Sequence, residues 1–316
     1  MKATPTLLET VLRRRRALVL GVSGEGDLIQ ALPIAHFLRL AGVEVVFGGT
    51  AFGWWGLEGG ASSREPGPPI YDVAGLQPAQ ALARHVVRVA SASRYLRHRP
   101  AEAILAEFLG ASPLVCGLTG GVNGLRDSLA TAISELRIDL VVAVDLGGEV
   151  AHDGAVLAKA HTSMREFAVV AALSELETPV IYAFGGYGAA DDRTRDERAS
   201  RLLRATGCLG AIEPSQSEMK EMLEACALMS VSVPSGASRV PASATWGGAG
   251  RLNPLAATVL LFGPLAMIDE AGAARLKATK SLQAIERLDR AGRGPSRQTH
   301  WRPVAHFRGD GGGRPT

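Results

Sequence analysis

Three carboxylates lie close together near the middle of the sequence, at the end of a long apolar run. Asp145 closes that run, and Glu149 and Asp153 follow a pair of glycines. A buried carboxylate costs several kcal/mol unless a cation, a hydroxyl or a backbone donor lies beside it. Carboxylate oxygens are the ligands that Mg²⁺ and Ca²⁺ prefer, and they also bind sugar hydroxyls. The loop therefore predicts a metal ion or a hydroxyl-rich ligand at Asp145. The alternative is that Glu149 and Asp153 are solvated loop residues without a ligand.

Two more side chains could take part in this chemistry. His152 lies in the loop after Asp145, where an imidazole could carry a proton, although a lone loop histidine is often simply exposed. Asp27 begins a helical stretch, where it could cap the helix or bind a ligand. We expect Asp145, Glu149 and His152 to be the catalytic residues. Asp27 and Asp145 are the candidate ligands of a metal ion, which would be Mg²⁺.

Glycine-rich loops follow four of the apolar runs, and glycine lets backbone N–H groups approach a ligand closely. The N-terminus of a helix after such a loop adds partial positive charge, which favours an anion. A tight turn from strand to helix, without any ligand, is the alternative interpretation. The residues that we expect to bind the ligand are Gly24, Gly26, Asp27, Thr119, Gly120, Gly121, Asn123, Gly185 and Gly186.

Continuous apolar runs predict the buried parallel strands that would position these loops. The runs occupy residues 17–22, 43–47, 112–118, 139–145, 179–184 and 259–262. Helices are predicted at about 5–15, 28–40, 76–97, 101–109, 124–137, 163–176 and 215–229. Because the carboxyl ends of parallel strands share one edge of a sheet, the loops should meet there. The chain is therefore predicted to be a Rossmann-like three-layer α/β sandwich, with a mostly parallel sheet and helices on both faces.

The charge is unevenly distributed along the chain. The formal net charge is +3, but the excess of arginine lies at the two ends, and the stretch between them is acidic. Such a pattern does not favour a basic groove, so we expect no nucleic-acid partner. We expect a basic N-terminal segment at 1–16, a single domain at 17–290 and a disordered tail rich in arginine, glycine and proline at 291–316.

The sequence also bears on the cellular compartment of the protein. Its three cysteines form no Cys-x-x-Cys pair, and no apolar run reaches about 18 residues without polar interruption. The early basic residues are not followed by a signal-peptide pattern. We expect a cytoplasmic protein whose partner is a small molecule and not a membrane, with a homo-oligomer left open.

Several catalytic patterns are missing from the sequence. The first glycine loop reverses the order of the Gly-x-Gly-x-x-Gly pattern that binds NAD, and Phe47-Gly-Gly-Thr50 supplies no acid for the ribose. The Walker A pattern, the Gly-x-Ser-x-Gly elbow and the zinc spacings of paired histidine and cysteine are absent as well.

Three segments of the sequence form a recognisable set. They are Gly21-Val-Ser-Gly-Glu-Gly-Asp27 with Ala31-Leu-Pro33, then Phe47-Gly-Gly-Thr50, and Asp139-Leu-Val-Val-Ala-Val-Asp-Leu-Gly-Gly-Glu149. Together they resemble the DUF1152 family of bacterial and archaeal proteins. The resemblance runs over roughly 17–285. Asp27 and Asp145 match the family pattern, whereas Glu149 stands where the family usually has Asp, and Gly236 replaces an expected acid. The resemblance implies no particular reaction.

These observations favour a small-molecule enzyme that acts on a phosphorylated, nucleotide-like or polyhydroxylated substrate. Gly-rich loops and carboxylates at the carboxyl edge of the sheet would bind that substrate. The altered acids favour a first alternative, a non-catalytic ligand-binding or scaffold protein with a degenerate site. A second alternative is an NAD(P)-dependent oxidoreductase.

Overall fold

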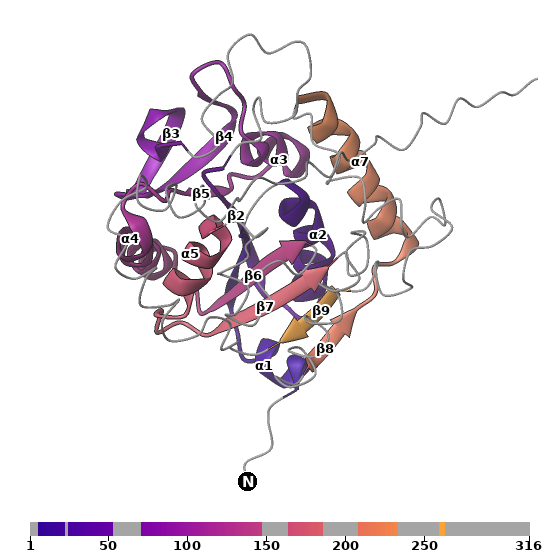
Figure 1. The fold of residues 1–316 in the computed structure, drawn as a ribbon. Coiled ribbons are helices and arrows are strands. Elements are labelled where there is room, and N and C mark those ends of the chain that lie inside the picture. Colours follow the sequence, from indigo (N-terminus) through magenta and orange to yellow (C-terminus); the bar gives the residue numbers. More distant parts are fainter. Residues whose placement is uncertain are drawn as a thin grey trace, which may run out of the picture.

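The computed structural model describes residues 6–22, 25–52, 71–146, 164–185, 208–232 and 259–262 (Figure 1). The strands are β1 Arg16–Gly21, β2 Glu44–Thr50, β3 Leu76–Ala83, β4 Val86–Tyr95, β5 Leu114–Cys116, β6 Leu140–Leu146, β7 Val180–Gly185, β8 Cys208–Ile212 and β9 Val259–Phe262. The helices are α1 Leu7–Val11, α2 Glu25–Leu40, α3 Ala101–Leu109, α4 Gly121–Leu136, α5 Met164–Leu173 and α7 Gln216–Ser232, with a 3-10 helix, η1, at Val73–Gly75. The described residues form a nine-stranded sheet in the order β3-β4-β5-β2-β1-β6-β7-β9-β8.

The centre of this sheet is parallel, in the order β5-β2-β1-β6-β7. From β1 the chain moves outward to β2 and β5, and it then returns to the opposite side of β1 with β6 and β7. The order therefore reverses between β1 and β6, which is where open α/β sheets bind ligands. Gly21 pairs with Val144, so β1 and β6 end side by side. The prediction of an α/β fold with a mostly parallel sheet is confirmed.

Antiparallel strands extend the sheet on both sides. On one side β4 pairs with β5 and β3 pairs with β4, and on the other β9 pairs with β7 and β8 pairs with β9. The predicted strand at 259–262 is confirmed as β9. The strand β8 was not predicted, because Leu209-Gly210-Ala211 has none of the β-branched or aromatic residues that favour a strand.

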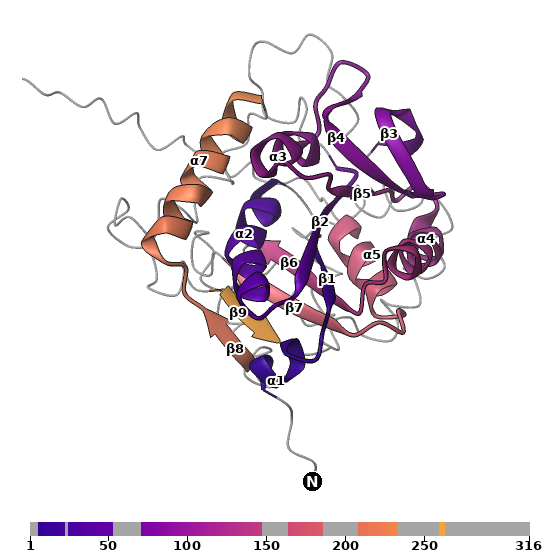
Figure 2. The same ribbon diagram turned by 180° about the vertical axis from the view of Figure 1, so that it is seen from behind.

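Two hydrophobic clusters pack on the parallel strands. Alternate residues of a strand point to opposite faces, and Leu18 and Leu20 of β1 belong to one cluster while Ala17 and Val19 belong to the other. The first cluster contains residues of α4 and α5, and the second contains residues of α2, α3 and α7. In Figures 1 and 2, α4 lies beside α5, and α7 lies beside α2. We call the two faces the α4–α5 face and the α2–α3 face.

The helix predicted for 76–97 is wrong, because these residues form the antiparallel hairpin of β3 and β4. Its many alanines favour a helix. Val86 and Val87, however, are β-branched, and both pair with β5. Pairing with the rest of the sheet therefore outweighs the local preference. A two-residue turn, Arg84-His85, joins the two strands.

The other predicted helices are confirmed as α1, α2, α3, α4, α5 and α7, with ends that differ by a few residues. Within the described ranges, no helix combines the length and the hydrophobicity that a bilayer span requires. Residues 1–5 and the predicted tail at 291–316 lie outside the described residues. The division into segments at 16 and 290 stays a prediction.

Candidate functional site

Asp145 lies at the carboxyl end of β6 and is 2% exposed. Strand alternation places its side chain on the α4–α5 face, and its register partner Phe184 belongs to the cluster on that face. The first turn of α5 contributes two buried charged residues, Arg165 and Glu166. The Arg165 guanidinium lies 4.0 Å from the ring centre of Phe52, which follows β2. This end of the sheet therefore combines buried acids with a buried cation.

Asp27 lies in the first turn of α2 and is also 2% exposed. Its Cβ is 3.0 Å from the position that a Cβ would occupy at Gly21, so the glycine lets Asp27 approach the end of β1. Gly21 continues the alternation of Ala17 and Val19 and faces the α2–α3 side. Asp27, beside the end of β1, and Asp145, at the end of the neighbouring strand β6, thus lie at the same edge but approach it from opposite faces. A single ion bound by both would have to lie beyond the strand ends.

Another buried acid, Glu102 of α3, was not predicted. Its carboxyl carbon lies 3.0 Å from the position of a Cβ at Gly49, so the glycine makes room for the carboxyl group. Leu20 pairs with Gly48, so Gly21 and Gly49 are neighbours in the next register position. The glycine pair inside β2 was the available signal, because glycine inside a strand often marks a close approach. In the part of the chain that the structure describes, no group of three or more His, Cys, Asp or Glu could hold a metal ion.

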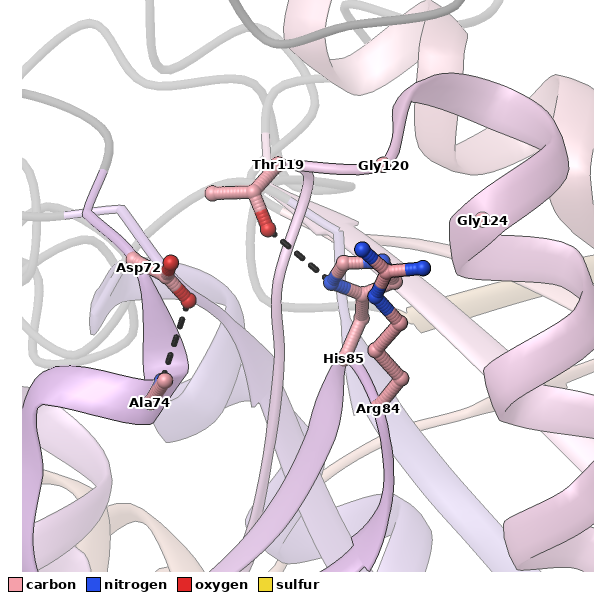
Figure 3. A pocket seen from close by; sticks show the side chains of 7 residues that line it. All are labelled: Asp72, Ala74, Arg84, His85, Thr119, Gly120 and Gly124. Atoms are coloured by element: carbon pink, nitrogen blue, oxygen red, sulfur yellow. Dashed lines mark hydrogen bonds between the residues drawn. The ribbon is translucent and has the colours of Figure 1, made fainter.

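A cavity of about 440 Å³ opens farther along the same edge, where β5 leads into α4 (Figure 3). It is formed by the residues around η1, by the tip of the β3–β4 hairpin and by the loop before α4. Because β2 and β1 separate β5 from β6, the cavity lies roughly 14 Å from Asp145, or three strand spacings. Its lining residues are Asp72, Ala74, Arg84, His85, Thr119, Gly120 and Gly124.

His85 is held by both its main chain and its side chain. Its N–H donates to Ser128 Oγ at 3.2 Å, and its carbonyl accepts the N–H of Gly117 at 2.7 Å. Its Nδ1 lies 2.9 Å from Thr119 Oγ1 (Figure 3). The ring packs on the loop so closely that a Cβ at Gly120 would lie 2.9 Å from the imidazole Cδ2. The imidazole position therefore requires a glycine at 120.

The surroundings of His85 favour its neutral form. Burial and the positive charge of Arg84 lower the pKa of His85, and the negative charge of Asp72 offsets part of that change. Asp72 also accepts the N–H of Ala74 at 3.0 Å and so caps η1. Arg84 itself is exposed and makes no ion pair with any described residue. Its guanidinium is therefore available to a ligand.

The N-terminus of α4 forms the other wall of the cavity. Gly120 at the N-cap supplies no side-chain hydrogen bond, and Gly121 has a φ of +68°, which glycine adopts readily. The first N–H groups of a helix lack intrahelical partners and carry partial positive charge. Together with the Arg84 guanidinium, they make this wall suited to an oxyanion.

The chain also matches a family model. The model, described as a protein of unknown function (DUF1152), matches residues 18–264. The chain belongs to the DUF1152 family. No curated protein matches the chain, and no solved structure does. The DUF1152 match contains the four acids that are buried among the described residues, and every residue of the cavity.

The predicted ligand residues of this DUF1152 chain fall in different places. Thr119 and Gly120 line the cavity, and Gly121 is buried at the start of α4. The Asn123 side chain instead accepts a hydrogen bond from Arg126 at 3.4 Å and does not line the cavity. Of the remaining residues, Gly26 and Asp27 belong to α2 and Gly185 ends β7. Gly24, Glu149, His152, Gly186 and Gly236 lie outside the described residues.

Sequence reasoning missed the three charged or titratable residues of the cavity, Asp72, Arg84 and His85. Arg84 and His85 were hidden because their segment was interpreted as a helix. The β-branched run that begins at Val86 was the signal that could have shown a strand after a turn. Asp72 is far from Thr119 in the sequence, and no pattern of residues connects the two.

Proposed function

We propose that this DUF1152 chain is a small-molecule enzyme that binds a phosphate-bearing substrate at the carboxyl edge of its sheet. The phosphate would lie over the N-terminus of α4. The cavity supports the proposal, because it brings together the unpaired Arg84 guanidinium, the Thr119 hydroxyl and a helix start without a side-chain cap. Each of these groups favours an oxyanion.

The buried acids have a separate part in this proposal. The roughly 14 Å between the cavity and Asp145 is a length that a nucleotide or a sugar phosphate can span. Asp145, with Glu149 and His152 that follow it in the sequence, would act on the far end of the substrate. Mg²⁺ usually binds one or two carboxylates together with substrate oxygens. We therefore propose Asp145 as its ligand, with Asp27 approaching the same edge from the other face.

Binding is tested with inorganic phosphate, followed by isothermal titration calorimetry on the full chain. We expect Arg84→Gln to weaken phosphate binding about tenfold, since a charge-assisted hydrogen bond is lost. Arg94→Gln is the matched control, because Arg94 is an exposed arginine elsewhere on β4 without an ion pair among the described residues. Equal effects of the two substitutions, or no binding by the wild type, would refute the proposed phosphate site.

Catalysis is tested with a panel of nucleotides and sugar phosphates. A compound at about 100 times its dissociation constant should add about 2.7 kcal/mol to the free energy of unfolding, which a thermal shift detects. We expect at least one stabilising compound to be converted when Mg²⁺ is present. Stabilisation without conversion of any binder would instead support a non-catalytic binding protein.

A further inference from the structure

We propose that His85 donates a hydrogen bond from Nε2 to an oxygen of the bound anion, and that Thr119 holds the imidazole in the tautomer that makes this possible. The inference rests on the proposed phosphate binding and goes further, because it assigns the recognition of the anion to a neutral imidazole. His85 would be a ligand-contacting residue, and Thr119 a positioning residue.

The hydrogen bond between Thr119 and His85 supports this tautomer. Its Oγ1 lies 2.9 Å from His85 Nδ1, and within the described chain the hydroxyl makes no second hydrogen bond. A hydroxyl has one proton to donate, and Nδ1 is the acceptor in reach. If the hydroxyl donates to Nδ1, that nitrogen carries no proton. The proton of a neutral imidazole is then on Nε2.

The position of Nε2 supports the same assignment. The side chain of His85 lines the cavity although the residue is only 8% exposed. Its Nε2 lies 3.2 Å from the position of a Cβ at Gly124, over the first turn of α4. None of the described residues forms a hydrogen bond with this nitrogen. An N–H at this place needs an acceptor from the cavity, and an oxyanion over the helix start would provide one.

The charges around the ring explain why a neutral donor suits this site. Burial lowers the pKa of His85, the charge of Arg84 at the hairpin tip lowers it further, and the charge of Asp72 before η1 raises it in part. The side chains that form hydrogen bonds with His85, Thr119 before α4 and Ser128 within it, are uncharged, and the start of α4 adds the positive end of the helix dipole. A second cation beside Arg84 would be repelled. Arg84 would therefore supply the charge, and His85 a directed hydrogen bond.

The first experiment follows sulfate binding against pH, because sulfate stays a dianion where phosphate titrates. We expect the affinity to stay within about twofold from about pH 6 to 8.5, on either side of the ordinary imidazole pKa. If a charged His85 bound the anion, the sulfate affinity of the protein would instead fall as pH rises through that range. A fall of about tenfold that disappears in His85→Gln would overturn the proposal.

The second experiment reads the tautomer directly from the ¹⁵N chemical shifts of the imidazole nitrogens. We expect the proton on Nε2 in the wild type, and a shift toward the Nδ1–H form in Thr119→Val with about 3- to 10-fold weaker sulfate binding. Thr119→Ser should restore both properties. Thr131→Val is the control, since Thr131 lies in α4, is exposed and donates to the carbonyl of Asp127. A wild-type spectrum with the proton on Nδ1 would refute the inference.

The two proposals fail in different ways. If the wild type binds neither phosphate nor sulfate, the proposed function is refuted, and the donation to an anion falls with it. If both anions bind while the spectrum shows an Nδ1–H or a charged imidazole, the proposed function stands and the role of His85 is wrong.

Discussion

The carboxyl edge of the sheet has two regions that are built differently. At the switch point between β1 and β6, the charged groups are buried: Asp27, Asp145, Arg165 and Glu166 are each at most 8% exposed. At the cavity beside β5, by contrast, Arg84 and Asp72 are exposed and Thr119 is half-buried. One region holds its charges inside the packing of the sheet, and the other presents them to solvent.

Because of this difference, the two regions should contribute differently to stability and to ligand binding. Buried side chains depend strongly on their surroundings, so a change in their size near the switch point should act mainly on folding. Exposed groups around a cavity contribute little to stability, so a change there should act mainly on ligand binding. The following predictions test this division, in order of decreasing expected effect.

The largest effect is expected for Phe184→Ala at the switch point. Phe184 is fully buried and pairs in register with Asp145, so its truncation should lower the free energy of unfolding by about 3–5 kcal/mol. Urea denaturation measures the change. Leu40→Ala is the control, since Leu40 is 87% exposed and its truncation should cost within about 0.5 kcal/mol. A loss below about 1 kcal/mol for Phe184→Ala would show that this region is not tightly packed.

A smaller loss is expected for Gly49→Ala. The added Cβ would overlap the carboxyl group of Glu102, and such overpacking costs about 1–3 kcal/mol. The double variant Gly49→Ala with Glu102→Ala tests the cause, because removing the carboxyl group relieves the overlap. The two changes should therefore cost less together than the sum of their separate effects. Additive costs would show that Gly49 is needed for another reason.

Asp145→Asn tests whether the switch point and the cavity act independently. The substitution keeps the shape of the side chain, so we expect a change in the free energy of unfolding within about 1–2 kcal/mol. Because the cavity is roughly 14 Å away, inorganic phosphate should bind within twofold of its wild-type affinity while conversion of the substrate is lost. If calorimetry shows weaker phosphate binding instead, the two regions form one site.

The smallest effect concerns pH. The folded state lowers the pKa of His85, so it favours the neutral imidazole, and the unfolded chain binds more protons as the pH falls below about 6.5. The free energy of unfolding should therefore decrease with falling pH in that range, and less so in His85→Asn. Burial and Arg97 lower the pKa of His98 too, so the difference between the two proteins isolates His85. Identical pH dependence would show that the imidazole titrates normally.

The parallel part of the fold could be predicted because its signals are local. Runs such as Leu140 to Asp145 are apolar without alternation, as expected for strands covered on both sides. The hairpin of β3 and β4 could not be predicted in the same way, because its alanines favour a helix and only pairing with β5 decides otherwise.

The candidate site was predictable in its location but not in its arrangement. Glycine loops indicated the carboxyl edge, where Thr119 and Gly120 do line a cavity. The faces on which Asp27 and Asp145 lie depend on strand register, which cannot be predicted from any single segment of the sequence. Arg84 and His85 reach Thr119 only through the sheet, so their proximity is a property of the topology.

The two-residue turn at Arg84-His85 limits how this cavity can diversify. Ala83 pairs with Val86 across the turn, and inserting one residue would send the following side chains of β4 to the other face of the sheet. Relatives with altered ligand preference should therefore differ by substitution at positions 84 and 85, while the length of this connection stays constant.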